Sequence, residues 1–256
     1  MLLAAGAGAL AVPGLASAGS GGASAASGGA STGSPSASNP NVAPGNAPVS
    51  ASGDGITLES NASAFLRSGV SVTGTVPAGD AGAAVEIDQL SATAGSAWTP
   101  AAVVRAQANG SFAATWLTTR PGPVTIRALL QGSQATSAVS SLPAVSVTVY
   151  RRSIATLYGP GFWGQRTACG VILRRRTIGV ANRTLPCGTD VQVYYNGNVM
   201  TVPVIDRGPY ADHANWDLTM ATGRALGMQG TETIGAAALP SAAGPMPGAA
   251  TPPSAQ

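Results

Sequence analysis

The residues of this chain that could do chemistry gather in one short stretch. Asp206-Arg207-Gly208-Pro209-Tyr210 ends an apolar run and comes shortly before Asp217. Carboxylates in such a place can donate and accept protons, and an arginine can hold a carboxylate or bind an anionic group. Because only 10 acidic and 13 basic residues occur among 256, each of these charges can be weighed singly. Loops held by rigid elements often carry sites.

Each of these residues also has a structural alternative. Asp206 precedes a Gly-Pro turn, where an aspartate can accept hydrogen bonds from its own backbone. Asp217 stands before an expected helix, where it can cap the first-turn amides. Arg207 can form a structural ion pair with Asp206. The residues alone leave these alternatives open.

The cysteine and histidine content favours a disulfide over a metal. Cys169 and Cys187 fall in the same segment, and an even count in an exported protein predicts a disulfide. With His213 as the single histidine, the chain lacks the four ligands of a structural zinc site. We therefore expect no metal and no cofactor, and nothing in the pattern indicates an oligomer, so we expect a monomer.

Both ends of the chain have the composition of unstructured or processed segments. Residues 1–18 are apolar and small and end in Ala-Ser-Ala, which predicts a secretory signal peptide. Residues 19–53 and 239–256 are rich in Gly, Ser, Ala and Pro, which predicts a linker and a disordered tail. We expect a secreted or cell-envelope protein.

Residues 54–150 alternate between apolar and polar positions in several short runs, such as 70–76 and 145–150, with turn signals between them. This pattern predicts a β-sandwich with Trp98, Phe112 and Trp116 in its core. It weakly resembles bacterial immunoglobulin-like (Ig-like) domains. No catalytic group of residues occurs in this segment.

Residues 151–238 predict a small β-barrel with one helix. The expected strands are 154–158, 178–181, 190–195, 199–205 and 232–236, with Asn196-Gly197 as a hairpin turn. Apolar residues from Leu218 to Leu226 recur at helical spacing and end at Gly227. The predicted fold is therefore mainly β: an Ig-like β-sandwich followed by a six-stranded barrel with one short helix.

This second segment resembles the RlpA-like (rare lipoprotein A) double-psi β-barrel family, whose barrel recurs in expansins and barwin-like proteins. Five motifs carry the resemblance in order, namely Ala155-Thr156-Leu157-Tyr158-Gly159-Pro160-Gly161-Phe162-Trp163-Gly164, Thr167-Ala168-Cys169-Gly170, Thr184-Leu185-Pro186-Cys187-Gly188-Thr189, Val204-Ile205-Asp206-Arg207-Gly208-Pro209-Tyr210 with Asp217-Leu218, and Ala225-Leu226-Gly227-Met228. The family includes lytic transglycosylases that cut peptidoglycan, and the resemblance implies that Asp206 is the catalytic acid and base. Active members carry a glutamate and a histidine where this chain has Val171 and Asn182. A non-catalytic, expansin-like module that binds glycan or loosens the wall is the alternative.

The resemblance also implies which residues contact sugar. Rings in a Gly-rich loop can stack on sugar faces, or they can plug one end of the barrel. The residues expected to bind substrate are Tyr158, Trp163, Asn182, Arg207, Tyr210 and Asp217.

The expected partner is peptidoglycan or another wall polysaccharide. The charge run Arg174-Arg175-Arg176 is expected to be a solvated face or a contact to anionic wall polymers. No nucleic-acid motif is present, so we expect no nucleic-acid partner. No cysteine follows the signal segment for lipid attachment, so we expect no stable membrane anchor.

Overall fold

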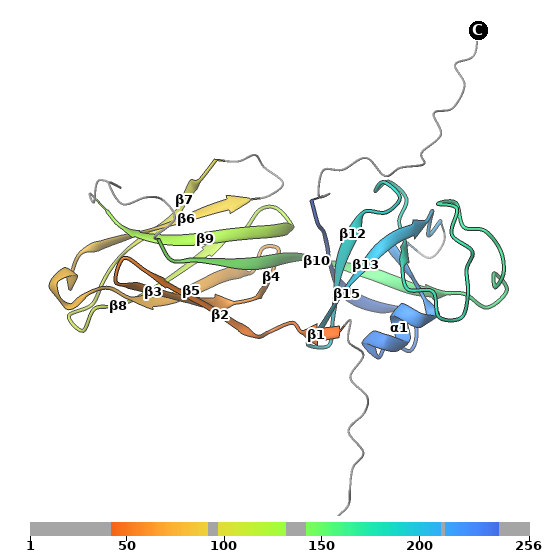
Figure 1. The fold of residues 1–256 in the computed structure, drawn as a ribbon, viewed down its shortest axis with the longest axis horizontal. Helices are drawn as coiled ribbons and strands as arrows, with labels where there is room; N and C mark the ends of the chain where they lie inside the picture. Colours follow the sequence, from red (N-terminus) through yellow and green to blue (C-terminus); the bar gives the residue numbers. More distant parts are fainter. Residues whose placement is uncertain (1–41, 92–96, 132–141, 211–212, 241–256) are drawn as a thin grey trace, which may run out of the picture. The chain divides into compact units, whose positions relative to one another are not determined.

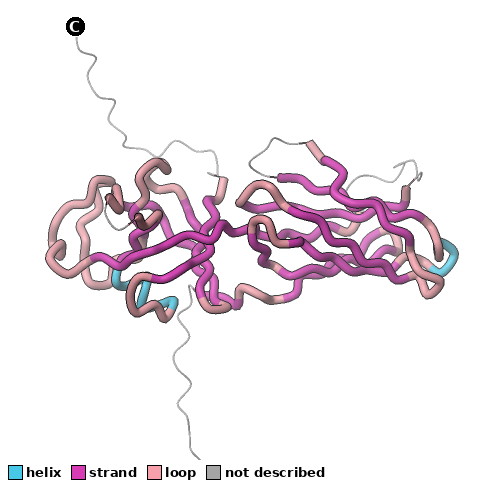
Figure 2. Tube along the Cα trace, turned by 180° about the vertical axis from the view of Figure 1, so that it is seen from behind, coloured by secondary structure: helices cyan, strands magenta, loops and turns pink. Residues whose placement is uncertain are grey.

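The computed structural model describes residues 42–91, 97–131, 142–210 and 213–240. The predicted signal peptide, most of the predicted linker and most of the predicted tail lie outside these residues. Strands dominate the described part, which holds one α-helix and one short 3-10 turn, η1 (Ala78–Asp80) (Figure 1, Figure 2). The predicted mainly β fold is confirmed. None of the described helices is long and apolar enough to cross a membrane.

The first part of the chain is a β-sandwich, as predicted. One sheet has the order β2-β3-β5-β8, and the other joins β7, β6, β9 and the beginning of β10, with β4 beside β10. Burial alternates along several of these strands, as on β3 and β8, because successive side chains point to opposite faces. Their bounds are β2 (Pro48–Gly53), β3 (Ile56–Asn61), β4 (Ser63–Phe65), β5 (Gly69–Thr75), β6 (Ala84–Ser91), β7 (Thr99–Arg105), β8 (Ser111–Leu117), β9 (Gly122–Leu130) and β10 (Ala144–Tyr158).

The core of the sandwich differs from the prediction at one aromatic residue. Phe112 and Trp116 are buried in it. Trp98 is only partly buried, and the Arg127 guanidinium lies 4.2 Å from the centre of its ring. Arg127 also forms an ion pair with Asp88 at 2.8 Å. Trp98 therefore covers a charged pair instead of filling the core. Membership of the sandwich in an Ig-like family stays a prediction.

The second part is a closed barrel of six strands. The order β10-β14-β11-β13-β12-β15 returns to β10, because β10 pairs with both β14 and β15. Their inward side chains, including Val180, Val204 and Leu218, form one buried cluster. The bounds of the further strands are β11 (Val180–Ala181), β12 (Asp190–Tyr195), β13 (Asn198–Asp206), β14 (Trp216–Thr219) and β15 (Glu232–Ala238).

One predicted boundary is wrong. The end of the predicted linker is structured: β1 (Val42–Pro44) pairs with β13, and β2 (Pro48–Gly53) pairs with β3. Small residues can do this because ladder hydrogen bonds come from the backbone, which every residue except proline supplies in full. β10 runs without a break through the predicted boundary between residues 150 and 151, where its pairing changes from β9 in the sandwich to β15 in the barrel.

The helix α1 (Met220–Leu226) begins two residues later than predicted. Thr219 is its N-cap, and its side-chain oxygen accepts a hydrogen bond from the Thr222 N–H. Gly227 ends the helix in the left-handed conformation, as predicted. Asp217 lies inside β14, so the alternative that it caps this helix is wrong. The predicted hairpin at Asn196 and Gly197 is confirmed.

Candidate functional site

A bulge in β13 brings two carboxylates onto one face of the barrel sheet. Val180 pairs with Val204, but the next residue, Ala181, pairs with Asp206, so Ile205 is an extra residue in β13. An extra residue reverses which face the following side chains occupy. Ala181 also pairs with Asp217 on its other side. Asp206 and Asp217 therefore flank Ala181 on the outer face, with their Cα atoms about 10 Å apart, two strand spacings.

The bulge has a local cause in the packing of Ile205. A Cβ atom added to Gly179 would lie 2.6 Å from the Ile205 side chain. Ile205 thus packs directly on the Gly179 backbone, and it is buried although Val204 beside it is buried too. Two consecutive buried residues at this strand end leave Asp206 to point outward with Asp217.

The neighbouring strand β10 adds two hydroxyl groups to the same face. Thr156 pairs with Asp217, and Tyr158 pairs with Thr219. The Thr156 hydroxyl donates to Asp217 Oδ1 at 2.9 Å. Prediction from the sequence did not single out Thr156, although the period of two along Ala155–Tyr158 places it beside Tyr158. The outer face therefore holds two carboxylates, a threonine and a tyrosine.

Backbone N–H groups hold the Asp206 carboxylate. Its Oδ1 accepts hydrogen bonds from the Ala168 N–H at 2.9 Å and from the Arg207 N–H at 2.8 Å. The bond from Arg207 corresponds to the turn alternative, whereas the bond from Ala168 comes from a distant loop. Because Ala168 contributes only its backbone, no side-chain pattern could have revealed it. Asp206 is therefore held as a hydrogen-bond acceptor.

A disulfide and an arginine fasten the loops around Asp206. Cys169 and Cys187 form the predicted disulfide, with a Cα–Cα distance of 5.6 Å. Arg207 Nη1 donates to the Asn182 and Leu185 carbonyl oxygens at 3.2 and 2.8 Å, and Nη2 contacts Cys187 Sγ at 3.3 Å. Arg207 thus braces the loop that the disulfide ties to Ala168. These contacts replace the ion pair with Asp206 that the sequence left open.

The carboxyl of Asp217 has a raised pKa. Its pKa is raised from 3.8 to about 6, first because burial disfavours the charged form and further because Asp206 lies near. The hydrogen bond from Thr156 opposes this rise in pKa. A carboxyl with a pKa of about 6 exchanges protons readily near neutral pH, which suits a general acid.

Tyr158 lies beside both carboxylates. Burial, then the charges of Asp206 and Asp217, raise the pKa of its phenol well above 10. The hydroxyl oxygen is buried, and among the described residues it has no hydrogen-bond partner. Its hydroxyl is therefore closed to direct contact with sugar in this structure.

The other residues expected to bind substrate occupy different positions. Asn182 Oδ1 accepts hydrogen bonds from the Thr184 and Leu185 N–H groups, so it shapes a turn. The Trp163 ring packs on Gly159, whose added Cβ would lie 2.3 Å from it. Tyr210 is 79% exposed, next to the Asp206 turn.

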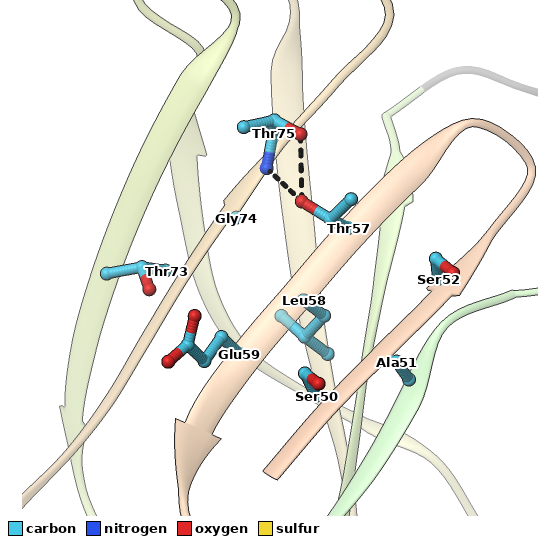
Figure 3. Close-up of a pocket in the computed structure, with 9 residues that line it drawn as sticks. All are labelled: Ser50, Ala51, Ser52, Thr57, Leu58, Glu59, Thr73, Gly74 and Thr75. Atoms are coloured by element: carbon cyan, nitrogen blue, oxygen red, sulfur yellow. Dashed lines mark hydrogen bonds between the residues drawn. The ribbon is translucent and has the colours of Figure 1, made fainter. Parts of the chain in front are cut away.

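A depression in the surface lies elsewhere, on the sandwich. It has a volume of about 510 Å³ and lies on β2, β3 and β5, where Ser50, Thr57, Glu59 and Thr75 line it (Figure 3). Thr57 and Thr75 bond to each other across it at 2.8 Å. Glu59 is the one titratable side chain that lines it. We therefore place the candidate site at Asp206 and Asp217, because two carboxylates lie together there, and not at the depression on the sandwich. No group of metal-ligating side chains occurs among the described residues.

Comparisons with known proteins agree with the barrel. A family model described as "Lytic transglycolase" matches residues 151–238. A "Probable endolytic peptidoglycan transglycosylase RlpA" of Synechocystis is 39% identical over 87 residues, 33% of this chain and 27% of the relative. The protein of the same name in Aquifex aeolicus is 40% identical over 81 residues, 31% of this chain and 36% of the relative. The "Endolytic peptidoglycan transglycosylase RlpA" of Campylobacter jejuni is 35% identical over 77 residues, 29% and 28%. The match thus spans 27–36% of the length of these relatives.

Two solved structures show more distant likeness. The Streptomyces papain inhibitor is 26% identical with a TM-score of 0.29, covering 35% of this chain and 93% of that one. The D0-D1 domain of intimin is 16% identical with a TM-score of 0.26, covering 68% and 87%. TM-scores this low do not establish a shared fold, so we base no conclusion on these two structures.

Proposed function

We propose that residues 151–238, an RlpA-like double-psi β-barrel, cleave the glycan strands of peptidoglycan outside the cytoplasm as a lytic transglycosylase. The observation that carries this proposal is the pair of carboxylates on one outer face, one of which has its pKa raised to about 6. The relatives named as peptidoglycan transglycosylases and the disulfide, which is typical of oxidising compartments, support it.

The geometry favours Asp217 over Asp206 as the proton donor. Asp206 Oδ1 already accepts two backbone N–H groups, which suits a carboxyl that acts as a hydrogen-bond acceptor. Asp217 accepts one hydroxyl and has the raised pKa. We therefore assign the acid and base to Asp217, and to Asp206 the negative charge that stabilises the developing positive charge on the sugar ring.

The proposed reaction needs no water and no second reactant. Asp217 gives its proton to the glycosidic oxygen as the bond from that oxygen to the sugar carbon C1 breaks, and the bonding electrons stay with the leaving oxygen. The 6-hydroxyl oxygen of the same sugar then bonds to C1, and its proton returns to Asp217. The product is a 1,6-anhydro sugar end, and the enzyme regains its starting protonation state. This differs from hydrolysis, in which one carboxyl activates water.

Two residues favour a second candidate, a barrel that binds glycan without cleaving it. Val171 and Asn182 stand where active family members carry a glutamate and a histidine, and the Asn182 side-chain oxygen is taken up by its own turn. One experiment separates the two candidates: the full chain is incubated with peptide-free glycan strands, and mass spectrometry detects 1,6-anhydro ends.

We expect such ends from the wild type and a loss of about 100-fold or more in Asp217→Asn, as for removal of a general acid. Asp190→Asn is the matched control, because Asp190 is exposed at the start of β12. Absence of anhydro ends in the wild type, with binding to wall glycan retained in a pelleting assay, supports the second candidate. If Asp206→Asn loses activity and Asp217→Asn keeps full activity, the general acid is Asp206 and our assignment to Asp217 is wrong.

A further inference from the structure

Tyr158 carries a hydrogen-bond donor that the resting protein does not use. Its hydroxyl is buried and has no partner among the described residues, although buried polar groups are nearly always bonded. On the same strand, Tyr150 shows the usual arrangement: it is 1% exposed, and its hydroxyl donates to Gln192 Oε1 at 2.9 Å. An unbonded buried hydroxyl opposes folding, so its place beside the carboxylates calls for a functional reason.

The charges that face Tyr158 come from two strands. Asp206 at the end of β13 and Asp217 on β14 are the titratable groups that act on it. Among the residues packed on this face, Thr156 already donates to Asp217, and Thr219 caps α1. The Arg207 guanidinium is bonded to the loop at 182–187. The Tyr158 hydroxyl is thus a buried, uncommitted donor next to the carboxylates.

The proposed reaction creates a need for such a donor. When Asp217 releases its proton, a second negative charge forms beside Asp206 in a half-buried place. We propose that the Tyr158 hydroxyl then turns to donate to the Asp217 carboxylate, so that Tyr158 is a positioning residue for the ionised state of Asp217. The part of this inference that concerns catalysis rests on the proposed function. A bond formed only after proton transfer accelerates the reaction, because it stabilises the transition state more than the resting state.

The inference makes opposite predictions for two tyrosines on one strand. At pH 4, where the Asp217 carboxyl is protonated, Tyr158→Phe removes an unbonded buried hydroxyl, so we expect the midpoint of thermal unfolding to rise by about 4 °C. Tyr150→Phe leaves Gln192 without its donor, so we expect the midpoint to fall by about 4 °C. Both substitutions keep the ring and its packing, so each serves as the control for the other.

The decisive measurement is the titration of Asp217 in the full chain, followed by carbon-13 NMR of labelled aspartate carboxyls. The Asp217 signal is assigned by its absence in Asp217→Asn. A hydroxyl that donates to a carboxylate favours its charged form. In Tyr158→Phe we therefore expect the pKa of Asp217 to rise above the wild-type value, and in Tyr150→Phe we expect no change. An unchanged Asp217 titration in folded Tyr158→Phe overturns the inference.

An activity assay completes the test without replacing the titration. If the wild type forms 1,6-anhydro ends, Tyr158→Phe should lower kcat about 10-fold with KM unchanged. A raised KM with an unchanged kcat would instead indicate that Tyr158 binds sugar, and would overturn the inference. If the wild type forms no such ends, the proposed function fails, and the titration alone still decides whether Tyr158 serves Asp217.

Discussion

The raised pKa of Asp217 makes the stability of the barrel depend on pH in a definite direction. Its carboxyl binds a proton more tightly in the folded chain, where the pKa is about 6, than in the unfolded chain, where the pKa is 3.8. Folding is therefore most favoured, with respect to this group, below pH 3.8. That contribution to stability is lost as the pH rises toward 6, and above 6 the buried charge opposes folding.

The magnitude follows from the difference between the two pKa values. A rise from 3.8 to about 6 corresponds to about 3 kcal/mol. Because Asp217 is only partly buried, solvent screening reduces this, and we expect about 1–2 kcal/mol. Asp217→Asn removes the charge and keeps an oxygen that can accept the Thr156 hydroxyl. We compare the free energy of unfolding of the variant with that of the wild type at two pH values. The advantage of the variant should be about 1–2 kcal/mol larger at pH 8 than at pH 4.

Urea unfolding followed by circular dichroism at pH 4 to 8 measures this difference. Asp190→Asn serves as the control, because Asp190 is exposed and its removal should leave the shape of the pH profile unchanged. The reasoning fails if the difference between Asp217→Asn and the wild type stays constant across this range.

Two further predictions concern the loops that hold Asp206. Replacing Cys169 and Cys187 together by serine should lower the free energy of unfolding by about 3 kcal/mol, which urea unfolding measures; equal stability would contradict this. Arg207→Met should lower it by about 1–3 kcal/mol and weaken hydrogen-exchange protection at Ala168, because the loop at 182–187 loses two donated hydrogen bonds. Loss of glycan binding with unchanged stability and protection would instead show that Arg207 contacts substrate.

Much of the fold could be predicted because many of its strands and turns show recognisable patterns over short stretches of sequence. The alternation of apolar and polar residues predicted the strands of the sandwich, and Asn196-Gly197 predicted the hairpin of the barrel. The pairing of β1 with β13 and the pairing of β2 with β3 could not be predicted in this way. Their small residues give no apolar pattern, and their hydrogen bonds come from the backbone, which carries no signal in the sequence.

The candidate site could likewise be predicted only in part. The types and order of residues were sufficient to select Asp206 and Asp217, and to predict the disulfide between Cys169 and Cys187. They could not assign roles, since Asp217 looked like a helix cap until the structure placed it in β14 and gave the cap to Thr219.

The sequence by itself determined which chemical groups are present and which strands could carry them. Only the tertiary structure decided that both carboxylates share one face. A side chain changes face with every residue along a strand, so one extra residue reverses its direction. The extra residue is Ile205, and its place depends on packing against Gly179, which comes from a different part of the chain. The same folding surrounds Asp217 with protein and with Asp206, which raises its pKa. Burial and long-range contact are properties of the assembled barrel, and no short stretch of residues contains them.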